Sequence, residues 1–167
     1  MRILSVGSLS GMSNTCLHRN WALHKVADEV DEINTQLNPI TLWGRICYHL
    51  FFLGLPIRIP ENNKENEKIC KMVKNKDYDI VWIDKGHTIL PSTLKYIKKI
   101  SPNTIIVSYS PDNMALRHNQ TQQYLETIPL YDYFFTNKSY ILDNMRKLGA
   151  KNIFFVNILV EHTFPEY

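Results

Sequence analysis

Residues 80–87 of the chain read IVWIDKGH, and residues 104–113 read TIIVSYSPDN. In both stretches a short, continuous run of Ile, Val and aromatic residues stops abruptly at polar residues. Similar apolar runs occupy residues 3–6, 133–136 and 153–156. Continuous rather than alternating apolar runs of this length are typical of strands buried on both faces, as in a parallel sheet that helices cover.

Segments with helical periodicity separate these strands. Pro91 suits the first position of one helix, and Gly149 stands where a left-handed cap is expected after another. The alternation of strand and helix predicts right-handed βαβ crossovers. The fold class is therefore α/β: a doubly wound, mainly parallel, Rossmann-like sheet of about six strands with helices on both faces. The predicted helices cover residues 13–30 (with Ser13 or Asn14 as N-cap), 42–53, 61–76, 91–100 and 138–148, and residues 30–36 are a candidate second strand.

Length and composition narrow the class of protein. The 167 residues suffice for one domain with a sizeable core. Nineteen Lys and Arg against sixteen Asp and Glu leave a charge of +3, too small to indicate a nucleic-acid binder, so no nucleic-acid partner is expected. Three cysteines, far apart, make a disulfide scaffold improbable, and a cytoplasmic protein is expected. The lysines of residues 64–76 predict a solvated helix face, with weak peripheral contact with anionic lipid as the alternative.

Polar residues follow each predicted strand at its carboxyl end. Ligands of open α/β sheets bind outside this edge, near the point where the strand order reverses. The loops at residues 7–14, 84–87, 110–120 and 137–139 are therefore expected to form one rim, opposite ordinary lysine-rich connectors. The candidate substrate-binding residues are Gly7, Ser8, Gly11, Ser13, Arg19, Asp84, Lys85, Ser110, Asn113, Asn119, Asn137 and Lys138.

Arg19 and Asp84 each allow two interpretations. Arg19 falls on the inward face of the first predicted helix, where an unpaired guanidinium is costly to bury. It is expected either to face the cleft or to pair with Asp84 or Asp112. Asp84 ends an apolar strand, as in a phospho-accepting receiver domain. Such a domain needs acidic residues where this chain has Gly7 and Ser8, so that function is excluded, and a capping role is the structural alternative.

Asp112 and His118 are the candidate catalytic residues. Asp112 follows Pro111 in a polar loop, where its carboxylate would act as a general base or cap the turn at Asn113. His118 lies beside Asn119 in the same loop. The histidines form no HExxH motif or i,i+4 pair, and the cysteines form no CxxC, so no metal site is expected. Without GxGxxG or a P-loop, no bound cofactor is expected either.

Several ordered motifs resemble the N-terminal half of GT-B glycosyltransferases of the spore maturation protein (CgeB-like) group, and the resemblance covers essentially the whole chain. These motifs are IVWIDKG (80–86), VSYSPDNM (107–114), HNQ (118–120), PLYD (129–132) and FTNKS (135–139), with VGS at 6–8 and FVN at 155–157.

The resemblance implies a function. Residues 1–160 would be a Rossmann-like, acceptor-side domain, and residues 161–167 a linker to an absent second domain that binds the nucleotide-sugar donor. The residues that would line the acceptor side of the cleft lie in five loop segments: 7–13, 84–86, 110–113, 118–119 and 137–138. The chain would then move a sugar to a hydroxyl acceptor (a glycan, a lipid-linked molecule or a protein) only with a donor-binding partner. In an inverting enzyme Asp112 or His118 would take the acceptor's proton, whereas a retaining enzyme needs no such base.

Two alternatives stay open. The first is a non-catalytic, flavodoxin-like binding module for a glycan or a protein partner, which would use the same polar edge. The second is a small stand-alone hydrolase, which is disfavoured because the chain has neither GxSxG nor a metal-binding motif.

Overall fold

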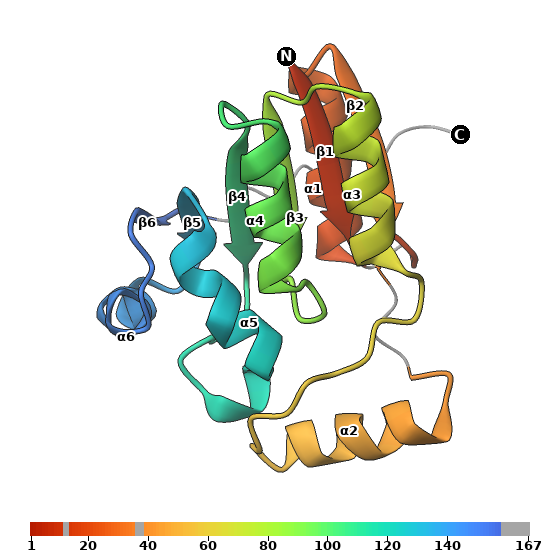
Figure 1. The fold of residues 1–167 in the computed structure, drawn as a ribbon. Coiled ribbons are helices and arrows are strands. Elements are labelled where there is room, and N and C mark those ends of the chain that lie inside the picture. The colour runs from red at the N-terminus through yellow and green to blue at the C-terminus, as the bar shows by residue number, and fades with distance from the viewer. Residues whose placement is uncertain (12–13, 36–38, 158–167) are drawn as a thin grey trace.

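The computed structural model describes residues 1–11, 14–35 and 39–157. They form one six-stranded, all-parallel sheet in the order β2-β1-β3-β4-β5-β6 (Figure 1). The order reverses between β1 and β3, which lie side by side at the centre of the sheet. The predicted doubly wound sheet is confirmed. The strands are β1 (Arg2–Gly7), β2 (Glu29–Asn34), β3 (Ile80–Asp84), β4 (Ile105–Ser110), β5 (Tyr133–Thr136) and β6 (Ile153–Phe155).

Helices cover the two faces of the sheet unequally. In Figure 1, α1 lies behind the sheet, whereas α3, α4 and α5 lie in front of it. The helix α2 stands apart, beyond the carboxyl ends of the strands. No helix among the described residues is long and apolar enough to cross a bilayer. The helices are α1 (Thr15–Val26), α2 (Leu42–Phe52), α3 (Glu65–Asn75), α4 (Pro91–Ile100), α5 (Gln122–Thr127) and α6 (Leu142–Lys147), with short 3₁₀ turns at Arg117–Asn119, Ile128–Leu130 and Ser139–Ile141.

Two clusters of apolar side chains form the core on the front face. The larger one joins β1, β3 and β4 to α3 and α4, with Ile69 and Ile97 fully buried. The smaller one joins β5 and β6 to α5 and α6 through Tyr124, Phe134 and Met145. Both clusters are built from the continuous apolar runs, which explains why these strands show no polar alternation.

Three of the predicted elements need correction, and one helix was not predicted. The helix expected over 13–30 ends at Val26, because Val30 pairs with Ile3 in the sheet instead. The helix expected over 61–76 begins at Glu65, after Lys64 in the left-handed conformation (φ 52°). The helix expected over 138–148 begins as a 3₁₀ turn. The short helix α5 was not predicted, since six residues show no helical periodicity.

Candidate binding site at the carboxyl edge

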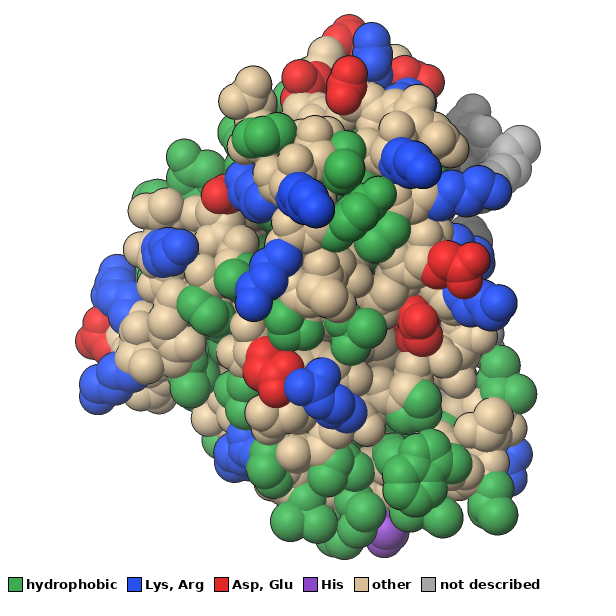
Figure 2. Space-filling view, in the orientation of Figure 1, with side chains coloured by type: hydrophobic (Ala, Val, Ile, Leu, Met, Phe, Trp, Pro, Cys, Tyr) green, Lys and Arg blue, Asp and Glu red, His purple; other side chains and the backbone are tan. Residues whose placement is uncertain are grey.

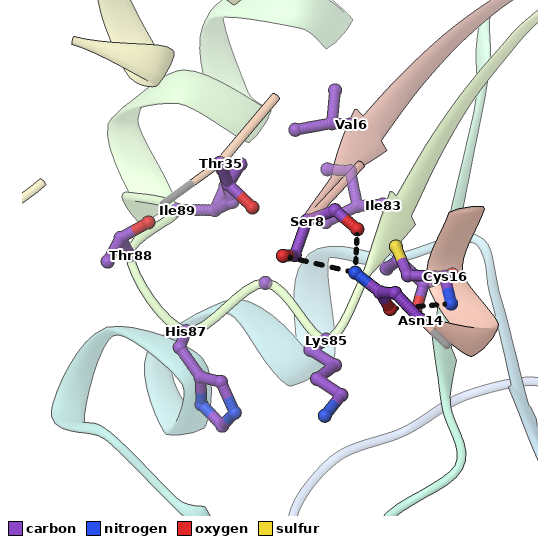
Figure 3. Close-up of a pocket in the computed structure, with 12 residues that line it drawn as sticks. Val6, Ser8, Asn14, Cys16, Thr35, Ile83, Lys85, His87, Thr88 and Ile89 are labelled. Carbon is purple, nitrogen blue, oxygen red and sulfur yellow. Dashed lines mark hydrogen bonds between the residues drawn. The ribbon is translucent and has the colours of Figure 1, made fainter. Parts of the chain in front are cut away.

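A small cavity lies where the strand order reverses, outside the carboxyl ends of β1 and β3. Its volume is about 130 Å³. Binding sites for whole small molecules usually measure about 300–1,000 Å³, so this cavity has room for part of a ligand only. The lining residues come from the ends of β1 and β3, the start of α1 and the loops that follow β1, β2 and β3 (Figure 3): Val6, Ser8, Asn14, Cys16, Thr35, Ile83, Asp84, Lys85, Gly86, His87, Thr88 and Ile89.

The loop after β3 forms the floor of the cavity in an unusual backbone conformation. Lys85 and Gly86 both have positive φ, at 63° and 71°. The Lys85 N–H donates to the Tyr109 carbonyl at 2.8 Å, and the Gly86 N–H donates to the Asp84 carbonyl at 2.8 Å. A Cβ atom on Gly86 would lie 2.8 Å from the Tyr131 hydroxyl. Only glycine therefore fits here, which explains its place in the DKGH motif.

A buried polar network anchors the far end of this loop. Asn66 Nδ2 donates to the Thr88 carbonyl at 2.9 Å, and Asn66 Oδ1 accepts from the Leu90 N–H at 2.9 Å. The Thr88 hydroxyl donates to the carboxylate of Glu65, which is fully buried. Because α3 supplies both Glu65 and Asn66, the packing of this helix positions the loop.

Arg19 and Asp84 form a buried ion pair beside the cavity. Arg19 Nε and Nη2 donate to the two carboxylate oxygens of Asp84 at 2.7 and 2.6 Å. The guanidinium also lies 4.3 Å from the centre of the Tyr109 ring. Of the two alternatives for Arg19, the structure selects the pair with Asp84. Burial and the nearby Asp84 carboxylate raise the pKa of the Cys16 thiol to about 12, so this cysteine is no nucleophile near neutral pH.

Lys85 and Asp112 neutralise each other at the rim. Lys85 Nζ lies 2.8 Å from Asp112 Oδ2, and both side chains are about one-third exposed. Every charged side chain that lines the cavity thus has an oppositely charged partner. Two hydroxyl groups also line the cavity: that of Thr35 and that of Ser8, whose Oγ accepts from Asn14 Nδ2 at 3.3 Å and whose O–H can still donate to a ligand. Such a site favours a neutral ligand rich in hydroxyl groups over an anion.

His87 is a site residue that sequence reasoning missed. Its ring is buried between Phe51 of α2 and Tyr124 of α5, at ring-centre distances of 5.7 and 5.9 Å. In Figure 3 the side chains of Lys85 and His87 extend away from Ser8 and Thr35, on the other side of the loop. His87 Nδ1 has no hydrogen-bond partner among the described residues. The only indication of His87 in the sequence was its position directly after the DKG residues, and the burial of its ring cannot be inferred from that position.

Burial of His87 makes the stability of the fold sensitive to acid. Desolvation, with a smaller contribution from the Lys85 ammonium, lowers the pKa of His87 from 6.5 to about 4. Between these pH values the unfolded chain binds a proton at this residue and the folded chain does not. The free energy of unfolding is therefore expected to fall as the pH drops through this window, by up to about 1.4 kcal/mol per pH unit. Above the window His87 contributes no pH dependence.

Urea unfolding of the wild type and the His87→Phe variant across this window measures the effect. Phenylalanine keeps the ring and removes the titration, so the difference between the two proteins isolates His87 from the carboxylates. Equal pH slopes for the two proteins would contradict the prediction.

Three further predicted site residues lie in the loops after β1 and β4 or at the ends of these strands, and they differ in how tightly they are packed: Gly7, Gly11 and Ser110. A Cβ atom on Gly7 would lie 2.5 Å from Cys16 Sγ, whereas one on Gly11 would meet nothing within 4 Å. Ser110 is fully buried, and its Oγ accepts weakly from the Asp112 N–H at 3.4 Å. Ser13 lies outside the described residues.

The other predicted residues lie on the same edge but do not line the cavity. Asn113 Oδ1 accepts from the Ala115 N–H, and Asn119 Nδ2 donates to the Asn113 carbonyl, so both asparagines hold the loop after β4. His118 is exposed on a 3₁₀ turn of that loop. Asn137 and Lys138 follow β5 and are half-buried, and Asn137 Oδ1 has no hydrogen-bond partner among the described residues. The structure thus brings Ser8, Asp84 and Lys85 together at the cavity and spreads the others along the rim.

Within the described part of the chain, no three His, Cys, Asp or Glu side chains are placed to share a metal ion.

Comparisons with known proteins identify the fold. No family model matches the sequence, and no curated protein is similar to it. Three solved structures share the fold, all of an alpha-glucosyltransferase. The complex with UDP and a 13-mer DNA containing a HMU base is 21% identical over 93% of this chain, with a TM-score of 0.54. The complex with UDP-glucose and DNA containing an abasic site is 19% identical over 93% of the chain (TM-score 0.52), and the complex with UDP is 20% identical over 98% (TM-score 0.50).

The chain spans only 41–42% of the length of these alpha-glucosyltransferase chains. Identities of 19–21% show a common fold and do not by themselves show a common activity. The predicted glycosyltransferase-like fold is confirmed at this level. The finer resemblance to the CgeB-like group stays a prediction.

The prediction that excluded nucleic acid as a partner is wrong. Two of the alpha-glucosyltransferase structures hold DNA. Net charge is a poor guide here because DNA binding needs basic side chains on one surface only, while acidic ones can gather elsewhere. In this chain four acidic residues gather around a depression at the amino edge of the sheet, away from the candidate site: Asp28, Glu29, Asp77 and Asp79. The chain therefore shares its fold with part of an alpha-glucosyltransferase, two structures of which hold DNA.

Proposed function

We propose that this chain is the acceptor-side half of a glycosyltransferase that moves a sugar from a nucleotide-sugar donor to a hydroxyl acceptor. Residues 1–160 would form this half, and residues 161–167 would lead to the donor-binding half. One observation carries the proposal: the polar cavity at the carboxyl edge is too small for a whole ligand, in a chain that matches two-fifths of an alpha-glucosyltransferase that binds UDP-glucose.

The charge pattern of the cavity supports an acceptor rather than a nucleotide. A nucleoside diphosphate needs unpaired cationic or backbone donors, but the Arg19 guanidinium is held by Asp84 and the Lys85 ammonium by Asp112. Hydroxyl groups on Ser8 and Thr35 suit the hydroxyls of an acceptor sugar or of a modified base. The second half would supply the groups that bind the donor phosphates.

Asp112 is the proposed proton acceptor for an inverting reaction. Its carboxylate stands at the rim, and Lys85 holds it in place at 2.8 Å. His118 is the second candidate, on the same loop and exposed to solvent. A retaining reaction would need neither group as a base. The stereochemistry of the product, determined by NMR, separates these two cases.

The acceptor role can be tested on the chain itself by NMR. We expect amide shifts at Ser8, Thr35 and Lys85 on titration with an acceptor probe, and none with UDP-glucose. The probes are glucose, an oligosaccharide and DNA containing a HMU base. Ser8→Ala, which removes one of the hydroxyl groups that line the cavity, should weaken binding of the active probe about tenfold, equal to about 1.4 kcal/mol. The matched control is Ser92→Ala, which removes the hydroxyl group of an exposed serine on α4.

Other outcomes overturn the proposal. Binding of UDP-glucose to the cavity of this chain would assign it to the donor side. If the protein expressed from its native reading frame binds a probe but neither hydrolyses nor transfers sugar from UDP-glucose or other nucleotide sugars, a non-catalytic binding module is supported instead.

A further inference from the structure

Seven large apolar side chains within residues 40–55 are exposed on and beside α2. They form one contiguous stretch of chain, which we call the α2 patch: Ile40, Leu42, Trp43, Ile46, Phe52, Leu53 and Leu55. Leu42 and Trp43 are 75% and 66% exposed. Figure 2 shows a gathering of apolar side chains on the part of the surface where α2 lies in Figure 1. Monomeric proteins rarely expose an apolar patch of this kind unless it binds something.

The α2 patch is not needed to hold α2 in place. The opposite side of the helix does this through Gly44, Cys47 and Phe51, which are buried. Phe51 packs against the His87 ring, and the Thr41 side chain caps the helix by accepting from the Gly44 N–H at 3.0 Å. The helix thus has a complete packing face and a second apolar face that points outward.

Most of the charged side chains around the α2 patch are basic. No Asp or Glu occurs between Glu32 and Glu61. Arg45 is exposed on α2 itself, and it has no ionic partner among the described residues. Arg117 also lies at this surface, 3.7 Å from the position that a Cβ atom on Gly54 would take. Arg58 alone is neutralised, by Glu126 at 2.7 Å. The surroundings of the patch therefore attract anions.

We propose that the α2 patch binds the surface of an anionic lipid bilayer. An exposed Trp and Phe beside aliphatic side chains and arginines is the pattern with which helices lie in a membrane interface, apolar face inward. The apolar side chains would enter the boundary between headgroups and acyl chains, and Arg45 and Arg117 would meet lipid phosphates. A nucleic acid is disfavoured as occupant, because seven apolar side chains offer nothing to its phosphates. This surface is separate from α3, the lysine-rich helix.

Vesicle co-sedimentation of the full chain tests this proposal. We expect binding to phosphatidylcholine vesicles that contain phosphatidylglycerol, weaker binding to pure phosphatidylcholine, and release at high salt. The double variant Trp43→Ser/Phe52→Ser should bind at least about tenfold more weakly, since each aromatic side chain contributes apolar area to the bound state. Arg45→Glu should weaken binding to the anionic vesicles only. The matched control, Tyr140→Ser, removes an aromatic side chain that is 67% exposed elsewhere and should bind as the wild type does.

Circular dichroism of each variant confirms that the fold is retained, which is expected because all the replaced side chains are exposed. The proposal would be overturned if the wild type did not bind the anionic vesicles or if the double variant bound them equally well. It would also be overturned if light scattering showed a dimer that depends on Trp43 and buries the α2 patch. A shift of Trp43 fluorescence with duplex DNA but not with vesicles would assign the patch to nucleic acid instead. None of these measurements requires sugar transfer, so failure of the lipid-binding proposal would leave the proposed glycosyltransferase function untouched.

Discussion

Asp84→Ala is expected to lower the free energy of unfolding by about 3–5 kcal/mol, because it leaves the Arg19 guanidinium buried without a counter-charge. The side chains of Asp84 and Arg19 are only 2% and 17% exposed. The variant also loses both charge-assisted hydrogen bonds to the carboxylate, at 2.7 and 2.6 Å. Urea unfolding at neutral pH measures the loss.

Asp112→Ala is the matched control for this experiment. It removes a carboxylate at the same edge of the sheet, whose partner Lys85 is partly exposed. Exposed ion pairs contribute only about 0–1 kcal/mol to the free energy of unfolding. Equal losses for the two variants would show that the pair of Arg19 and Asp84 is no more than a surface ion pair. A large loss for Asp84→Ala alone would confirm that Asp84 has a structural role, and would leave Asp112 as the carboxylate available for chemistry.

Gly86→Ala should destabilise the protein by about 2–5 kcal/mol, since a left-handed backbone costs about 1–2 kcal/mol and overpacking about 1–3 kcal/mol. The residue has φ 71°, and its new methyl group would lie 2.8 Å from the Tyr131 hydroxyl and 3.1 Å from Ile83 Cγ2. Both neighbours are almost completely buried, so neither can move aside freely.

Gly11→Ala separates the two causes. Gly11 has φ 90° but open space around it, so only the backbone cost of about 1–2 kcal/mol is expected. Thermal or urea unfolding of both variants gives the comparison. If Gly86→Ala is no worse than Gly11→Ala, the close packing of the loop after β3 is not a constraint, and the cavity floor is less rigid than the structure indicates.

The sequence predicted the strands best, because a strand that is buried on both faces has a continuous run of apolar residues. Continuous apolar runs such as residues 80–83 predicted five strands closely. Four of them, β1, β3, β4 and β5, lie inside the sheet, where a parallel strand has no solvent-facing side. The fifth, β6, is at the sheet edge and keeps Phe154 and Phe155 exposed. The helix α5 was missed, since its six residues are held by Tyr124 in a distant core and by the Thr121 cap rather than by periodicity. The end of α1 was misplaced because a strand with exposed polar residues at the sheet edge, β2, competes for Val30.

The edge of the sheet that carries the candidate site was also predictable. Parallel strands end at one edge, so polar loops after alternate segments must meet there. The partners within that edge were not predictable. Arg19 had three possible environments in the sequence, and only the packing of α1 against β1 and β2 brings it to Asp84 at the end of β3. The same limit hid His87, whose burial depends on Phe51 and Tyr124, 36 and 37 residues away along the chain.

The amino-acid sequence by itself determined the α/β class, the parallel sheet and the edge at which its polar loops gather, because these follow from the period and length of local apolar patterns. The tertiary structure alone decided which charges cancel at the cavity, which histidine is buried and that one face of α2 stays exposed. These properties depend on contacts between residues far apart in the chain, and the free energy of burying or pairing a group depends on those neighbours rather than on its place in a motif.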